Sequence, residues 1–306
     1  MAKTKSKPVH QLTIAQFEAM FPDETACKAY LVANRWPVEV ACPRCGNTKV
    51  YELDFKEFHW QCHKCEPQGY RFSVLVGTIF ENTNKPLRQW FQVIHLMLTS
   101  KKGISALQIY RLMGFGSYKT AWYMCHRVRV GLQDQDFQKL MGIVEVDETF
   151  VGGKRKNKHK NDRNLPKGGG RGSMGSGKIV VAGAVRRKGK VVARVIENID
   201  GETLTKFVRE SVSHRVSLLV TDAWQGYNKL DREFPHEVIN HHQGQYVVGA
   251  IHTNTIEGFW SIFKRGMIGT YHKVSRKYLP LYVAEFQFRY NHRQTADIFG
   301  AAIAGC

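Results

Sequence analysis

The N-terminal part of the chain changes from helical spacing of its apolar residues to strand-like alternation. Residues 11–35 carry apolar stripes at helical spacing, interrupted at Pro22. Residues 38–75 contain short alternating segments, of which Val50–Phe58 and Tyr70–Val76 are examples. The pattern predicts a helical segment followed by a small β-rich unit.

A helix is predicted directly after this unit. Apolar residues recur every three or four positions from Leu87 to Leu98. Asn84 is placed to cap the helix, and Pro86 suits its first turn because a residue there needs no free N–H.

A pair of helices follows, and it resembles a helix-turn-helix. Ile104–Gly114 and a stretch from Ser117 to Leu132 flank a glycine-containing break, and Ser117 can cap the second helix. Ordinary packing of two helices in a core is the alternative. If the pair reads DNA, the cations of its second helix face the phosphates or base edges, namely Lys119, Arg127 and Arg129.

The second half of the chain begins with strands and ends with helices. Strands are predicted at Ile143–Phe150, Ile179–Arg186, Lys190–Glu197 and Val216–Thr221, and helices at 202–213, 255–268 and 277–292. This order is typical of an α/β domain with a mixed sheet.

The charge balance points to a polyanionic partner. The chain has 306 residues with 45 Lys plus Arg against 26 Asp plus Glu, a formal net charge of +19. Neutralising nucleic-acid phosphates releases counterions, so such an excess favours DNA or RNA. Ribosome association, membrane-surface binding and plain solubility are the alternatives.

One segment concentrates this charge. Residues 154–178 are rich in glycine and hold nine Lys or Arg against one Asp. They predict a disordered loop that orders on DNA through Lys154, Arg155 and Lys156, with a merely solvated loop as the alternative.

The sequence predicts a cytoplasmic protein, nucleoid-associated in a bacterium or archaeon. Its longest apolar run, Ser73–Phe80, is far shorter than a membrane span, and no apolar segment follows the basic N-terminus as in a secretory signal.

Four cysteines in two close pairs predict a structural zinc site. Cys42 and Cys45 form one knuckle, and Cys62 and Cys65 form the other after 16 intervening residues. Four thiolates satisfy the tetrahedral preference of Zn²⁺ and leave no open position for catalysis. The rivals are a redox pair, unrelated thiols, or a ligand role for the nearby His59 or His63.

Three acidic residues predict a site for catalytic metal ions. Asp147 lies in a strand-like segment, Asp222 ends an apolar strand, and Glu257 opens a helix. Carboxylates that converge from two strands and a helix can hold two Mg²⁺ or Mn²⁺ ions for phosphodiester chemistry. Lys264 lies two helical turns after Glu257 and can touch a phosphate beside the metals, and Arg265 adds a DNA contact.

Each acid also has a structural interpretation. Asp147 can be one solvated acid among Glu145, Asp147 and Glu148, and Asp222 can cap the turn that begins at Ala223. Glu257 can form a capping-box-like pair with Asn254.

The order of these features resembles the insertion-sequence fifteen-ninety-five family, also called ISXO-two-like transposases. The resemblance runs from about residue 15 to 292 and rests on the zinc knuckles, the helix pair, VEVDETFVGGK (144–154), VTDAWQGY (220–227) and HTNTIEGFWSIFKRGMIGTYH (252–272). It implies an RNase-H-like catalytic domain with a DDE-type triad, whose first two acids are Asp147 and Asp222. For the third member the family implies an Asn with a downstream Lys, so Asn254 competes with Glu257. The 34 residues between Asp222 and Glu257 match the usual DDE separation and favour Glu257.

The expected protein is therefore a DNA transposase that cuts element ends and joins their 3′-hydroxyls to target DNA, acting as a homo-oligomer. A zinc-containing DNA-binding protein without catalysis and a metal-dependent endonuclease are the alternatives. The expected parts are a helical segment (1–36), a zinc ribbon (37–76), a helix-turn-helix-like DNA-binding region (77–136) and an RNase-H-like domain (140–296).

Overall fold

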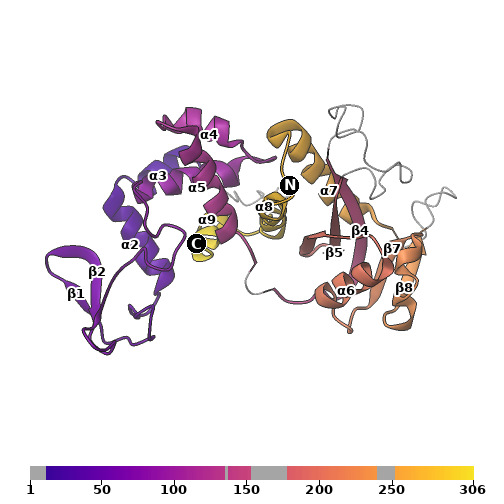
Figure 1. Cartoon of the computed structure of the whole chain (residues 1–306), viewed down its shortest axis with the longest axis horizontal. Helices are drawn as coiled ribbons and strands as arrows, with labels where there is room; N and C mark the ends of the chain where they lie inside the picture. The colour runs from indigo at the N-terminus through magenta and orange to yellow at the C-terminus, as the bar shows by residue number, and fades with distance from the viewer. Residues whose placement is uncertain (1–11, 135–136, 153–177, 240–251) are drawn as a thin grey trace, which may run out of the picture. The chain divides into compact units, whose positions relative to one another are not determined.

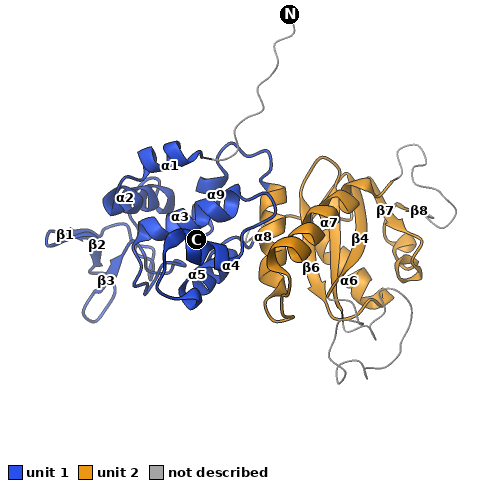
Figure 2. Ribbon diagram, turned by 90° about the horizontal axis from the view of Figure 1, so that it is seen from above, with its two compact units in different colours: residues 1–133, 292–306 blue, residues 134–291 orange. Residues whose placement is uncertain are grey.

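A computed structural model describes residues 12–134, 137–152, 178–239 and 252–306. The chain divides into two compact units (Figure 2). Unit 1 comprises Met1–Gln133 and His292–Cys306, and unit 2 comprises Asp134–Asn291. The finer four-part division stays a prediction.

A small antiparallel sheet of unit 1 carries the cysteine pairs. Its strands β1 (Tyr51–Leu53), β2 (Lys56–Cys62) and β3 (Tyr70–Ser73) lie in that order. Trp60 and Phe72, which face each other in the β2–β3 register, stack with ring centroids 5.9 Å apart. The predicted β-rich unit is confirmed.

The rest of unit 1 is helical. Its helices are α1 (Ile14–Met20), α2 (Glu24–Arg35), α3 (Leu87–Thr99), α4 (Ala106–Met113), α5 (Tyr118–Gly131) and α9 (Ile298–Ala304). Phe299 of α9 packs against Phe21 and Phe91 with centroids 5.4 and 5.5 Å apart, so the end of the chain belongs to the core of the N-terminal helices. Helix α9, which has only seven residues, was not predicted from the sequence.

The predicted cap of α3 is wrong. The N-cap residue is Pro86 rather than Asn84, and it makes no side-chain cap hydrogen bond. The carboxylate of Glu24 on α2 instead accepts the N–H groups of Leu87 (2.8 Å) and Arg88 (3.0 Å). A distant element thus satisfies donors that an α-helix leaves unpaired at its start.

The helix pair α4–α5 forms as predicted. Ser105 caps α4, and Gly114 ends it in the left-handed conformation at φ +61°. Ser117 caps α5 by accepting the N–H of Lys119 at 3.2 Å.

Unit 2 is built on a five-stranded mixed sheet (Figure 1). Its strands β4 (Ile143–Val151), β5 (Ile179–Arg186), β6 (Val191–Ile196), β7 (Leu218–Asp222) and β8 (His236–Ile239) lie in the order β6-β5-β4-β7-β8. The pairs β4–β5 and β5–β6 are antiparallel, whereas β4–β7 and β7–β8 are parallel. The predicted mixed sheet is confirmed, and β8 is an addition to it.

Helices cover both faces of this sheet. They are α6 (Gly201–Ser211), α7 (Asn254–Gly266) and α8 (Leu279–Asn291), with short turns η4 (Gln225–Tyr227), η5 (Leu230–Arg232) and η7 (Met267–Tyr271). Val144 and Val146 pack in the core formed with α6, while α7 and α8 pack with Val181 and Val185 on the other face. Because strand side chains alternate, Glu145 and Asp147 project toward the α7 face.

Among the described residues, no helix combines the length and apolar character that crossing a bilayer requires.

Candidate active site and zinc centre

Strand register brings Asp147 and Asp222 together. In the parallel pair β4–β7, Ile143 lies beside Leu218 and Glu145 beside Val220. The same register continued by two residues sets Asp147 beside Asp222, the last residue of β7. Neighbouring strands are about 4.8 Å apart, so Asp147 in the middle of β4 lies close to Asp222 at the end of β7.

The electrostatics show that four carboxylates lie close together. Burial first, and then repulsion from Glu148 and Asp222, raises the pKa of Asp147 to about 7. Glu257 adds a smaller repulsion. Burial and Asp222 also raise the pKa of Glu148 to about 7, against the lowering effect of its hydrogen bond from Tyr227. A bound cation would relieve this repulsion. Of the described residues, however, only the four cysteines of unit 1 have ligand atoms close enough together to share one metal ion, so the carboxylates lie near one another without forming a closed ligand set.

Glu148 belongs to the site but was not predicted. Its Oε2 accepts a 2.6 Å hydrogen bond from the hydroxyl of Tyr227, which is buried in the core beneath α6. The interpretation of Asp147 as one of three solvated acids is wrong, because Glu145 is fully buried and Asp147 and Glu148 are partly buried.

Asp222 makes a local turn in addition. Its Oδ1 accepts the N–H of Trp224 at 3.2 Å. The predicted helix cap is not formed, because the helical turn begins at Gln225 and its N-cap residue is Trp224. The hydrogen bond from Trp224 orients the carboxylate without removing it from the site, since Asp222 still repels the charge on Asp147.

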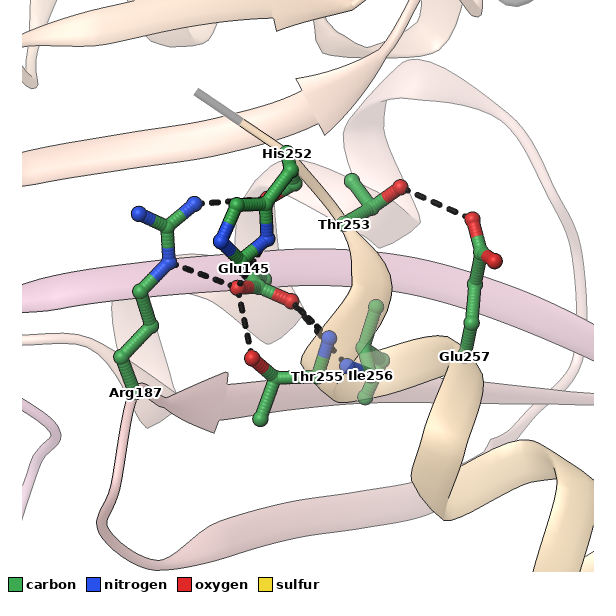
Figure 3. Close-up of polar contacts among 7 residues, drawn as sticks. All are labelled: Glu145, Arg187, His252, Thr253, Thr255, Ile256 and Glu257. Carbon is green, nitrogen blue, oxygen red and sulfur yellow. Dashed lines mark hydrogen bonds and ion pairs between the residues drawn. The ribbon is translucent and has the colours of Figure 1, made fainter. Parts of the chain in front are cut away.

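Helix α7 carries the third acid, Glu257, and a buried carboxylate holds the first turn of this helix (Figure 3). Glu145 Oε2 accepts the N–H groups of Thr255 (2.8 Å) and Ile256 (3.1 Å). Glu145 Oε1 accepts the hydroxyl of Thr255 at 2.8 Å and Nε of Arg187 at 2.7 Å. A guanidinium N–H of Arg187 also donates to the carbonyl of His252 at 2.8 Å.

Glu257 does not form the capping-box-like pair with Asn254. The N-cap residue of α7 is Thr253, and Asn254 is the first helical residue. Glu257 Oε1 accepts the hydroxyl of Thr253 at 3.0 Å, and both Asn254 and Glu257 are exposed on α7. Their shared exposed face keeps both available as site members.

A glycine on β5, Gly183, lets α7 approach the sheet beside Asp147. Asp147 pairs with Gly183 on β5. A Cβ on Gly183 would lie 2.6 Å from Cζ2 of Trp260 and 3.2 Å from Cδ1 of Ile256, both on α7. The helix therefore rests on β5 at the register position of Asp147.

Thr221, which precedes Asp222, is joined through His236 to Asp231 by successive polar contacts. The hydroxyl of Thr221 is 2.8 Å from Nε2 of His236, whose Nδ1 contacts Asp231. Thr221 is fully buried, so this arrangement cannot offer a nucleophile and instead ties β7 to β8.

The predicted DNA contacts divide into three groups. Lys119, Lys264 and Arg265 are exposed, as DNA contact requires. Arg129 is only 1% exposed, so its prediction as a DNA contact is wrong. The guanidinium of Arg127 donates to the carbonyls of Glu81 and Thr78, and its role as a DNA contact stays a prediction. Lys154, Arg155 and Lys156 lie outside the described residues.

The zinc site of unit 1 has the geometry that Zn²⁺ requires. The sulfur atoms of Cys42, Cys45, Cys62 and Cys65 all lie within 4.8 Å of one another. Sγ of Cys42 is 3.7 Å from that of Cys65, and Cys45 and Cys62 are separated by the same distance. Zn–S bonds of about 2.3 Å give a tetrahedron with edges of about 3.8 Å, so the four thiols fit structural zinc.

Two family models match the regions that contain these groups of residues. Residues 139–291 match the family model described as "ISXO2-like transposase domain", and residues 22–68 match "Transposase zinc-ribbon domain". This chain belongs to the ISXO2-like transposase family. Membership implies DNA as a partner and a DDE-type domain of RNase-H-like fold, in agreement with the strand order of unit 2.

A distant relative comes from a transposable element. The chain is 27% identical over 276 residues to an "Uncharacterized protein in transposable element ISH50" of Halobacterium salinarum, covering 88% of this chain and 91% of the relative. No solved structure was found to match the chain.

Gly183→Ala should destabilise unit 2, because the buried indole of Trp260 would have to move. We expect a loss of about 1–3 kcal/mol in the free energy of unfolding, measured by denaturant titration. Gly258→Ala is the matched control, since nothing lies within 4 Å of a Cβ at that position on α7, and it should be neutral or stabilising. Equal stability of Gly183→Ala and wild type would contradict the close seating of α7.

The raised pKa of Asp147 predicts a pH-dependent stability without added divalent ions. The folded state retains this proton up to about pH 7, whereas the unfolded state releases it near pH 4, so the stabilising contribution is lost as pH rises between them. Asp147→Asn removes the titration, and its Tm relative to wild type should rise from pH 5 to pH 8. At pH 8, Mg²⁺ should raise the Tm of wild type and leave that of Asp147→Asn nearly unchanged. A pH-independent difference between the two proteins would refute this.

Proposed function

We propose that this chain is an active DNA transposase. It cleaves the ends of its element and joins their 3′-hydroxyls to target DNA by two-metal-ion phosphoryl transfer. The observation that carries the proposal is the parallel β4–β7 register, which places Asp147 beside Asp222 when it is continued by two residues. Glu257 is close enough to repel the charge on Asp147.

Each side chain of the site has a proposed task. Asp147, Asp222 and Glu257 hold two divalent cations, Mg²⁺ or Mn²⁺. These ions would supply activation of the attacking oxygen and stabilisation of the leaving oxygen. Asn254 orients Glu257 or joins it as a ligand, and Lys264, about 10 Å further along the exposed side of α7, contacts a DNA phosphate.

Two alternative functions, DNA binding without catalysis and DNA cleavage without strand joining, explain fewer features of this site. A zinc-containing DNA-binding protein without catalysis needs no cluster of carboxylates in which burial, and then repulsion between the acids, raises the pKa of Asp147. A metal-dependent endonuclease would perform the same first step as a transposase, so strand joining separates the two.

The direct test compares cleavage and joining on a plasmid that carries the DNA flanking the gene. With Mg²⁺ or Mn²⁺, wild type should nick and join. Asp222→Asn and Glu257→Gln should lose at least about 100-fold in rate while retaining DNA binding and Tm. Nicking without joining would favour the endonuclease, and tight binding without any cleavage would favour the non-catalytic protein. Full activity of Glu257→Gln would transfer the third position to Asn254.

The proposal also assigns a DNA-binding surface beside the active site. The basic turn, residues 264–277, runs from α7 through η7 to the start of α8, and the chain contains no Asp or Glu between Glu257 and Glu285. Its cations are exposed and form no ion pair among the described residues: Lys264, Arg265, Lys273, Arg276 and Lys277. On α6, by contrast, Arg209 is paired with Glu233.

The salt dependence of DNA binding tests this surface. Replacing Lys273, Arg276 and Lys277 together by Gln should reduce the slope of log affinity against log salt by about 2–3, because each lost phosphate contact contributes about 0.9. The same change at Lys206, Arg215 and Lys229, three exposed cations elsewhere in unit 2, is the control and should leave the slope unchanged. Equal slopes for both triple variants would exclude the basic turn as a DNA contact.

The remaining parts complete the proposal. The zinc ribbon and the pair α4–α5 bind the element's ends, with Lys119 as a contact. Two ends held together require at least two copies of the chain, which act on DNA in the cytoplasm and nucleoid.

A further inference from the structure

A fully buried carboxylate lies next to the proposed metal site without belonging to it. Glu145 is 0% exposed and precedes Asp147 by two residues on the same face of β4. All of its hydrogen bonds described above come from Arg187 or from the first turn of α7. It therefore cannot reach DNA, and its role must be exerted through the groups that it contacts.

The helix that it contacts has no side-chain cap of its own. Thr253 occupies the N-cap position but makes no cap hydrogen bond, and its hydroxyl donates to Glu257 instead. The N–H groups of Thr255 and Ile256 would be unpaired without Glu145. A negative charge at a helix N-terminus is also favourable because it opposes the positive end of the helix dipole.

Arg187 makes the burial of this charge possible. Its Nε donates to Glu145, while the same guanidinium donates to the carbonyl of His252, just before α7. Nδ1 of His252 lies 3.4 Å from the same carboxylate oxygen. A buried carboxylate that is paired and fully hydrogen-bonded fixes geometry, because no alternative arrangement satisfies the same groups.

We propose that Glu145 is the positioning residue that sets Glu257 against Asp147 and Asp222. Asp147 is two positions after Glu145 on β4, about 7 Å away, and Glu257 directly follows Ile256. The hydrogen bonds of Glu145 with Arg187, Thr255 and Ile256, here called the clamp, thus fix the first and third acids relative to each other through two short segments of backbone. This inference rests on the proposed function and adds that divalent-ion affinity depends on a residue that is not a ligand.

The chain contains a matched control for a merely stabilising role. Glu24 caps α3 in the same way, accepting the N–H groups of Leu87 and Arg88. Helix α3 carries none of the proposed metal ligands. Losing either cap should lower stability, but only the cap of α7 should change the response to divalent ions.

The test is the Mg²⁺ concentration that produces half of the ion-induced rise in Tm, measured for full-length wild type, Glu145→Gln and Glu24→Gln. Both carboxylate oxygens of Glu145 accept hydrogen bonds. In Glu145→Gln the amide NH₂ replaces one of these oxygens, so in either orientation of the amide it faces N–H or O–H donors that it cannot accept. We expect the midpoint of Glu145→Gln to rise about 10-fold or more, as for other residues that orient ligands, and that of Glu24→Gln to stay at the wild-type value. An unchanged midpoint in Glu145→Gln, or equal shifts in both variants, would overturn the inference.

A second measurement covers the case in which Glu145→Gln does not fold. First-turn amides of a helix have no intrahelical acceptor, so protection of the Thr255 and Ile256 amides from hydrogen exchange in wild type reports on Glu145 itself. We expect protection comparable to that of the β4 core, and exchange at the rate of solvent-exposed amides would refute the clamp. A wild type that shows these protected amides but no response to Mg²⁺ or Mn²⁺ would instead refute the proposed function.

Discussion

The geometry of unit 2 depends on one interaction, the seating of the first turn of α7 on the buried carboxylate of Glu145. This contact joins residues 110 positions apart in the sequence and satisfies two helix donors that have no other acceptor in the described part of the chain. Gly183 supports the same seating of α7, because the indole of Trp260 occupies the space beside Asp147 that a larger side chain on β5 would fill. A polar clamp at the start of the helix and a close apolar contact one turn later determine where Glu257 lies.

Two helices of the chain are capped by a carboxylate from a distant part of the sequence. Glu24 and Glu145 each cap a helix that follows them far along the sequence, and each caps a helix without a side-chain cap of its own. Helices that are capped locally, such as α4 by Ser105 and α6 by Asp200, need no such partner. A distant carboxylate adds a constraint that a local cap lacks, because it fixes the start of the helix relative to another element.

Features that depend on nearby residues could be predicted from the sequence. The cysteine spacing, the glycine break between α4 and α5, the strand that contains Asp147 and the apolar strand that ends at Asp222 all follow from local pattern. Comparison with known families confirms the zinc ribbon and the transposase domain.

Features that depend on distant packing could not be predicted. Asn84 looked like a cap because the sequence does not reveal that Glu24 lies beside the start of α3. Arg129 looked like a DNA contact because helical periodicity alone does not show which side of α5 is buried. Glu145 was grouped with the neighbouring acids, and its position between two valines of a strand, which is a signal for a buried charge, was not used.

The most direct test of this account is a double-mutant cycle in Mn²⁺ affinity, measured by isothermal titration calorimetry on wild type, Glu145→Gln, Glu257→Gln and the double variant. If Glu145 acts by placing Glu257, the two effects share one cause, and Glu145→Gln should change affinity less than about twofold once Glu257 is already Gln. Independent, additive losses would show that Glu145 influences the site by another route and would contradict the central role of the clamp.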